Sequence, residues 1–308
     1  MEKEKISVKT TKNLTVPTDK LSFNPFKIPK DKFAKSLEKG VAFTEKVIDG
    51  EKIQTKYFLT LLDGYGELTP LNFFDRCTLT CCISAQQAGE KAVTTDVIFR
   101  MLTGRTHKNF RGTEKIKLEI LKSIKRLMSV SITIQMNDVC KKFKYNNAGE
   151  WKDFTANILP CCIIGGIVDG KEIDVIKFYD KSPILRVATE FKTKQIIGYS
   201  IEPLNSPKIH NTQDNICIKN YVLYQIKLMK CGRRDNKTLK FDSIVETCGI
   251  DVKDRNKRHD VKQVVLKFLE HLKTIGEIKN FFLFSDGDLK NPVTNNQQKF
   301  HGFKIETE

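Results

Sequence analysis

The sequence lacks the features of several protein classes. It has no run of about 18 consecutive apolar residues, so we expect no membrane-spanning helix. Its first residues, MEKEKISVKTTK, contain no apolar core like that of a secretory signal peptide. Acidic residues are in deficit, with 37 Asp and Glu against 53 Lys and Arg. The resulting net charge of +16 favours a polyanionic partner, either nucleic acid or an anionic membrane surface. General Lys-rich usage would also produce this charge.

The cysteines form no CxxC pair, which disfavours a disulfide framework and a zinc site. There are nine of them, an odd number, and most lie inside apolar runs. The five histidines are scattered along the chain. This pattern predicts reduced, buried thiols in a cytoplasmic protein, and no metal centre.

Motifs of catalysis are missing as well. The sequence has no HExxH or GxSxG, and no pair of histidines followed by a tyrosine as a strand-nicking enzyme needs. Gly165–Lys171 matches the phosphate-loop pattern GxxxxGK, but Glu172 stands where a Ser or Thr would bind magnesium. Strand-like sequence on both sides predicts a hairpin turn instead. We expect no enzymatic activity and no cofactor.

Periodicity predicts an α+β protein with three parts. Residues 1–56 are rich in Lys and interrupted by Pro17, Pro25 and Pro29, which predicts a basic, largely disordered arm with a short helix possible at 32–39. Domains are then expected at 57–205 and 206–308, because Pro203 and Pro207 mark a linker.

Both predicted domains carry helices and strands in a similar order. A strand is expected at 57–62. In the first domain, helices are then expected at 70–89, 97–104 and 113–128, then a strand at 131–136, a basic insertion at 138–156, and a hairpin at 157–168 and 171–179. A short helix at 182–191 and a strand at 195–200 follow. In the second, the expected helices are 211–230, 243–249 and 257–275, with strands at 239–241, 277–285 and 299–305. The pair Ser243 and Glu246 matches a capping box for the short helix.

The third helix of each predicted domain is amphipathic and basic. Eight basic and two acidic residues lie between Arg105 and Arg126, and seven basic and three acidic residues between Lys253 and Lys273. Such a helix could enter a DNA groove, with Lys and Arg contacting phosphates. A solvated surface helix is the alternative for each. The candidate DNA-binding residues are Arg111, Lys115, Lys122 and Arg126 in the first domain, and Arg255, Lys257, Arg258, His259, Lys262, Gln263 and Lys267 in the second. Base reading is assigned to Arg111, Lys115, Arg258, His259 and Gln263.

The runs LTPLNFFDRCTLTCCISAQQAG, VTTDVIFRMLTGR and TEKIKLEILKSIKRLMSVSITI resemble the first domain of replication initiator (Rep) proteins of plasmids and mobile elements. Residues 211–284 resemble their second domain. The resemblance implies tandem winged-helix domains that bind repeated origin sequences, and a dimer interface on the first domain. It would place 113–128 and 257–275 in successive major grooves, and 169–171 and 286–291 at wing tips, which adds Lys171 to the candidates. The insertion at 138–156 and the N-terminal arm depart from the pattern.

The leading hypothesis is a non-catalytic protein that binds double-stranded DNA at origin repeats, initiates replication of a plasmid or mobile element, and recruits a host helicase and other replication proteins. A transcriptional regulator with the same fold is one alternative. A protein-interaction module whose basic surface meets acidic proteins is another. An enzyme acting on nucleic acid is disfavoured by the missing motifs.

Overall fold

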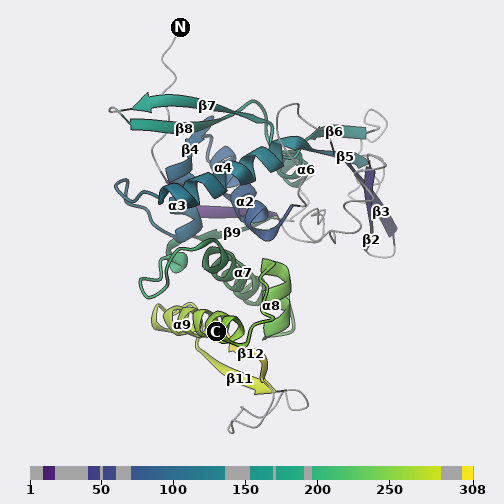
Figure 1. The fold of residues 1–308 in the computed structure, drawn as a ribbon. Coiled ribbons are helices and arrows are strands. Elements are labelled where there is room, and N and C mark those ends of the chain that lie inside the picture. Colours follow the sequence, from purple (N-terminus) through teal and green to yellow (C-terminus); the bar gives the residue numbers. More distant parts are fainter. Residues whose placement is uncertain are drawn as a thin grey trace. The chain divides into compact units, whose positions relative to one another are not determined.

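The structure, a computed structural model, describes residues 10–17, 41–48, 51–59, 71–135, 153–168, 171–190, 196–285 and 300–307 (Figure 1). The chain forms two compact units. Unit 1 comprises Met1–Met101 and Thr106–Tyr199, and unit 2 comprises Leu102–Arg105 and Ser200–Glu308. Both mix helices and sheets, so the predicted α+β class is confirmed.

Helix α2 (Phe73–Gln87) forms the centre of unit 1. Nearly every one of its residues is buried, because β1 (Asn13–Pro17) and α4 (Glu114–Ser129) both pack against it. The sequence predicts a disordered arm where β1 lies. In this strand Leu14 and Val16 alternate with polar residues and are buried, and the backbone N–H of Thr15 donates to Ser84 Oγ at 2.7 Å. Long-range burial of two alternating side chains therefore orders this piece of the arm.

A three-stranded antiparallel sheet accompanies the helices of unit 1. Its strand order is β4-β8-β7, and β7 and β8 form the predicted hairpin, with Val168 opposite Lys171. Gly165 and Gly166 therefore lie in a strand rather than a phosphate loop. The elements are β4 (Ala92–Thr94), α3 (Thr95–Thr103), β7 (Cys161–Val168) and β8 (Lys171–Phe178).

The strand that follows α4 belongs to a different sheet. The sequence predicts this strand at 131–136, ahead of the insertion and the hairpin. In the structure β5 pairs with β3 and β6, in the order β2-β3-β5-β6 (Figure 1). Two of these strands fall wholly or partly in the region predicted as an arm. The predicted helix at 32–39 and most of the insertion, 138–152, lie outside the described residues. The bounds are β2 (Val41–Ile48), β3 (Glu51–Leu59), β5 (Val130–Gln135) and β6 (Asp153–Asn157), followed by α6 (Pro183–Glu190) and β9 (Ile196–Ser200), which pairs with β1.

Unit 2 is built around α7 (Gln213–Lys230), whose middle is buried on all sides by its neighbours. Helices α8 and α9 pack on α7, and α8 also packs on β12. The sheet order is β10-β12-β11, with antiparallel pairing throughout. The remaining bounds are η2 (Glu202–Leu204), β10 (Thr238–Lys240), α8 (Phe241–Cys248), α9 (Arg255–Thr274), β11 (Asn280–Ser285) and β12 (Phe300–Glu306).

The two units repeat one topology. Each has a long helix, a short strand, a short helix, a third helix and a strand hairpin, and its sheet has the order first strand, third strand, second strand. In unit 1 the strands β5 and β6 are inserted between the third helix and the hairpin. In both units the third helix is the basic one selected from the sequence, α4 and α9.

Two predicted helix starts are wrong in detail. Helix α2 is capped by Asn72, whose side chain accepts from Asp75 N at 3.0 Å, while Asp75 Oδ2 accepts from Asn72 N at 2.8 Å. Helix α8 begins at Phe241, directly after β10, so Ser243 lies inside its first turn and cannot serve as a capping residue. For α8, the end of β10 at Lys240 fixes where the helix begins, and the capping-box match in the sequence does not.

Candidate nucleic-acid interface

Helix α4 is held against unit 1 by one apolar face. Thr113 caps its N-terminus by accepting from Ile116 N at 3.4 Å, and Ile116, Ile120, Ile124 and Leu127 are buried. The opposite face turns to solvent: Lys115, Lys122 and Lys125 are exposed, and Leu118 is 52% exposed among them. Lys115 and Lys122 therefore lie on the solvent-exposed face of α4, as the sequence predicts.

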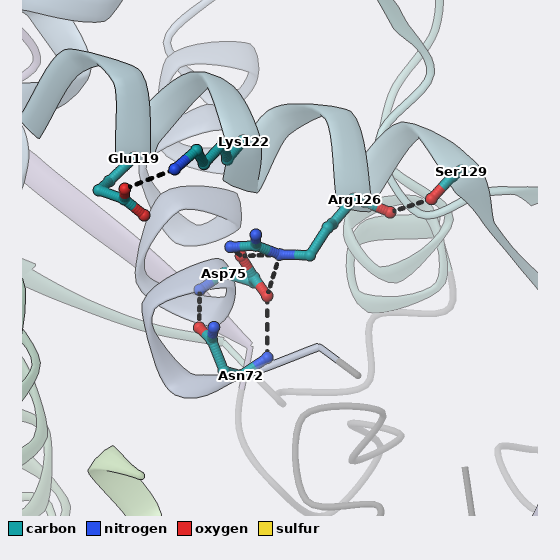
Figure 2. Close-up of polar contacts among 6 residues, drawn as sticks. All are labelled: Asn72, Asp75, Glu119, Lys122, Arg126 and Ser129. Atoms are coloured by element: carbon teal, nitrogen blue, oxygen red, sulfur yellow. Dashed lines mark hydrogen bonds and ion pairs between the residues drawn. The ribbon is translucent and has the colours of Figure 1, made fainter. Parts of the chain in front are cut away.

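Arg126 is directed away from that face, toward the start of α2 (Figure 2). Its Nε lies 3.1 Å from both oxygens of Asp75, and its Nη2 lies 2.7 Å from Oδ1. Asp75 is fully buried, so this bidentate pair neutralises a carboxylate that also caps a helix. The sequence proposes Arg126 as a DNA contact, whereas the structure engages its guanidinium inside unit 1.

Lys122 has a weaker internal partner. Its ammonium lies 2.9 Å from Glu119 Oε1, one turn away on α4, and half of its side chain is exposed (Figure 2). Exposed pairs at this spacing contribute only about 0.5 kcal/mol or less, so a phosphate can replace Glu119 at little cost. Lys122 thus stays able to contact an anion in a way that Arg126 does not.

The loop before α4 is fixed by two side chains of α3 that the sequence reading missed. Arg100 is buried; its Nε donates to Thr10 Oγ1 at 2.7 Å and its Nη1 to the carbonyl oxygens of Lys108 and Phe110 at 3.2 and 3.4 Å. Asp96 Oδ1 accepts from Gly112 N at 3.1 Å. An arginine within the apolar run VIFRML was the available signal. Arg111, a predicted base reader, is exposed on this loop.

Three basic side chains of α9 are oriented by its neighbours in unit 2. Lys257 Nζ lies 2.9 Å from Asp214 Oδ2 on α7, and this hydrogen bond raises the pKa of Lys257. Arg258 Nη2 lies 3.0 Å from Asp242 Oδ1 on α8, and its Cζ lies 4.7 Å from the centre of the Phe241 ring.

The third, Lys262, places its Nζ 4.1 Å from the centre of the Phe300 ring on β12. Phe300 in turn contacts Phe241 edge to face, with ring centres 5.6 Å apart. Two cations one turn apart on α9 thus bracket an aromatic pair. These contacts hold the flanks of α9 and set where its charges lie.

The remaining predicted residues of α9 face outward. Arg255, His259 and Lys267 are exposed and Gln263 is half-buried. Asn256, which the sequence reading did not select, is exposed beside them, and its backbone N–H donates to the capping side chain of Asp254 at 2.9 Å. The structure therefore brings Arg255, Asn256, His259, Gln263 and Lys267 onto the solvent side of one helix.

The strands of the unit 1 hairpin combine basic, acidic and exposed apolar residues. Lys171 lies in β8, but Ile164 and Ile167 on β7 are 45% and 75% exposed, and Glu172 is exposed beside Lys171. The predicted wing tips at 169–170 and 286–291 lie outside the described residues. The two strands thus carry no net charge, because Lys171 and Lys177 are balanced by Glu172 and Asp174.

Unit 2 also holds a buried lysine that the sequence reading missed. Lys219 is fully buried in α7, and its Nζ donates to Leu204 O at 3.0 Å and Asn211 Oδ1 at 2.8 Å. Burial, with Arg105 nearby, lowers the pKa of Lys219 to about 7. His271, whose pKa is lowered by burial, lies near it and contacts Pro203 O at 3.2 Å. A lysine within the apolar run ICIKNYVLY was the available signal.

No metal or membrane feature emerges from the described residues. Of the cysteines that the structure describes, Cys162 is half-buried, Cys231 is exposed and the others are buried, all as free thiols. No group of three or more His, Cys, Asp or Glu in this part of the chain could hold a metal ion. No described helix is both long and apolar enough to cross a membrane.

Comparison with known proteins gives little likeness. No protein-family model and no curated protein matches the chain. Among solved structures, the crystal structure of RctB domains 2-3 (residues 155–483) matches with a TM-score of 0.43 and 10% identity, over 87% of this chain and 91% of that one. A selenomethionine derivative of RctB domains 2 and 3 matches with a TM-score of 0.40 and 11% identity, over the same shares. Likeness at this level supports no conclusion about function.

Proposed function

We propose that the chain is a non-catalytic, sequence-specific double-stranded DNA-binding protein with two winged-helix domains. The observation that carries the proposal is the repeated topology, in which a basic third helix precedes a strand hairpin in each unit. In helix-turn-helix proteins and their relatives, the helix in this position enters the major groove. The exposed Lys115 and Lys122 of α4 and Arg255 and Lys267 of α9 provide the charge, and the exposed His259 adds a hydrogen-bonding group.

The biological role we propose is initiation of plasmid or mobile-element replication in the cytoplasm. It rests on the resemblance of residues 57–305 to Rep proteins and on the net charge of +16. Binding to origin repeats would bend or open the DNA, and a host helicase and other replication proteins would then be recruited. The proposal also includes a homodimer that forms through the first domain, as the resemblance implies.

Fluorescence polarisation with DNA from around the protein's own gene tests the proposal. We expect submicromolar binding to direct repeats and an affinity that falls steeply with salt, because each phosphate contact releases counterions. Equal affinity for a random duplex of the same length would refute sequence-specific binding.

A transcriptional regulator is the second candidate, since the same fold and the same exposed residues serve it. Mapping the bound sites in the genome separates the two. Binding at an origin supports initiation, whereas binding confined to promoters supports regulation.

A further inference from the structure

The outward faces of α4 and α9 carry different chemistry. On α4 the exposed side chains are three ammonium groups and a leucine, namely Lys115, Leu118, Lys122 and Lys125, together with one carboxylate in the first turn, Glu114. On α9 the outward side chains include two amides, an imidazole and a carboxylate, namely Asn256, His259, Asp260 and Gln263. The two helices therefore offer a DNA duplex different kinds of contact.

The face of α4 suits the phosphate backbone. A lysine ammonium is a flexible point charge that meets phosphate oxygens with little regard to sequence. Leu118 has no hydrogen-bonding group, and the guanidinium that could have formed a bidentate contact with guanine, Arg126, is engaged with buried Asp75. This face provides affinity without a pattern of fixed donors and acceptors.

The face of α9 suits base edges. Asn and Gln amides pair with the N6 and N7 atoms of adenine, and an Asp carboxylate accepts from the amino group of cytosine.

Three cations of α9, Lys257, Arg258 and Lys262, lie to the sides of this polar strip, whereas Arg255 and Lys267 lie on the solvent side with it. Lys257 is held by Asp214 on α7, whereas Arg258 and Lys262 are held by the Phe241 and Phe300 rings on the other flank. A helix with cations at its flanks and hydrogen-bonding groups along its middle matches a major groove, where phosphates border the base edges.

We infer that α9 determines the DNA sequence bound, through Asn256, His259 and Gln263, and that α4 contributes phosphate contacts through Lys115 and Lys122. This inference rests on the proposed DNA-binding function. It assigns specificity to unit 2 and backbone affinity to the third helix of unit 1.

The test uses the full chain and a randomised duplex library. Sequences enriched by the wild type are identified, and the selection is repeated with Asn256→Ala, His259→Ala and Gln263→Ala, and with the matched double variant Lys115→Ala/Lys122→Ala. Each variant's affinity for the enriched duplex and for a random duplex is then measured at several salt concentrations. Thermal melting confirms that these surface changes leave the fold intact.

Each α9 variant is expected to lose roughly tenfold in affinity for the enriched duplex, as for one lost base contact, and to relax selection at one or two positions. Its affinity for the random duplex stays within about twofold, because the phosphate contacts remain. The α4 double variant loses affinity for both duplexes equally, and its salt slope falls by about 2 while the enriched sequence is unchanged.

Two results would overturn the inference while leaving the proposed function standing. In one, the α9 variants lose affinity for the enriched and the random duplex by the same factor. In the other, the α4 double variant selects a different sequence from the library. If the wild type enriches no sequence at all, the proposed function itself fails.

Discussion

Arg126 and Asp75, on two different helices, form a bidentate ion pair in which Asp75 is completely buried. The same carboxylate accepts the backbone N–H of Asn72 at 2.8 Å, so it joins the N-terminus of α2 to the C-terminal half of α4 (Figure 2). The pair fixes the position of α4, and with it the outward face that carries Lys115 and Lys122.

Replacing Asp75 with Ala is expected to lower the free energy of unfolding of unit 1 by roughly 3 kcal/mol, because it leaves a guanidinium and a helix N–H without their acceptor. Urea denaturation followed by circular dichroism measures the loss. Glu119→Ala, which removes the half-buried partner of the exposed Lys122, is the matched control and should cost about 0.5 kcal/mol or less. Equal losses in the free energy of unfolding would show that the buried pair stabilises unit 1 no more than the exposed pair does.

Exchanging the charges of Lys257 and Asp214 separates folding from DNA binding. The double variant Lys257→Asp/Asp214→Lys restores an ion pair between α9 and α7, and since the pair is partly exposed we expect stability to stay within about 0.5 kcal/mol of wild type. DNA affinity should nevertheless fall, because α9 then carries a carboxylate where a cation flanked the groove. If polarisation assays show unchanged affinity, Lys257 does not contribute to DNA binding.

Lys219 should make unit 2 more stable as the pH rises. The folded protein releases the Lys219 proton at a pKa of about 7, whereas the unfolded chain keeps it up to the ordinary value near 10.5. Between these values the unfolded state binds more protons, so the free energy of unfolding increases with pH above about 7. Lys219→Met should lose this slope, because the titrating group is gone.

Urea midpoints between pH 6.5 and 9 measure the effect. Lys208→Met is the control, because Lys208 is exposed in the same unit and its loss should leave the slope as it is. A slope that persists in Lys219→Met would mean that another group titrates.

Gly302 allows β12 to pass close to β10. A Cβ at this position would clash with the backbone of Leu239 and Lys240, which cannot move aside as a flexible side chain can. We expect Gly302→Ala to lower the free energy of unfolding of unit 2 by about 1–3 kcal/mol. The control is Gly166→Ala on β7, where a Cβ would meet only Ile173 at 4.0 Å; a similar loss in both variants would contradict this reason.

Local patterns in the sequence were enough to place most elements. The third helices expected at 113–128 and 257–275 lie at Glu114–Ser129 and Arg255–Thr274, because a 3.6-residue apolar period and a capping side chain are properties of the segment itself. The hairpin around residue 169 was predictable for the same reason: two strand-like runs flank a turn. The α+β class follows from these elements.

The sequence alone determined the helices, the hairpins and the net charge of +16. Only the tertiary structure decided which charges remain on the surface, since ion pairs depend on residues far apart in the chain. Arg126 and Asp75 are 51 positions apart, and Lys257 and Asp214 are 43 apart. The pairing of β5 with β3 and the burial of β1 and Lys219 have the same cause: each depends on a partner that no local period reveals.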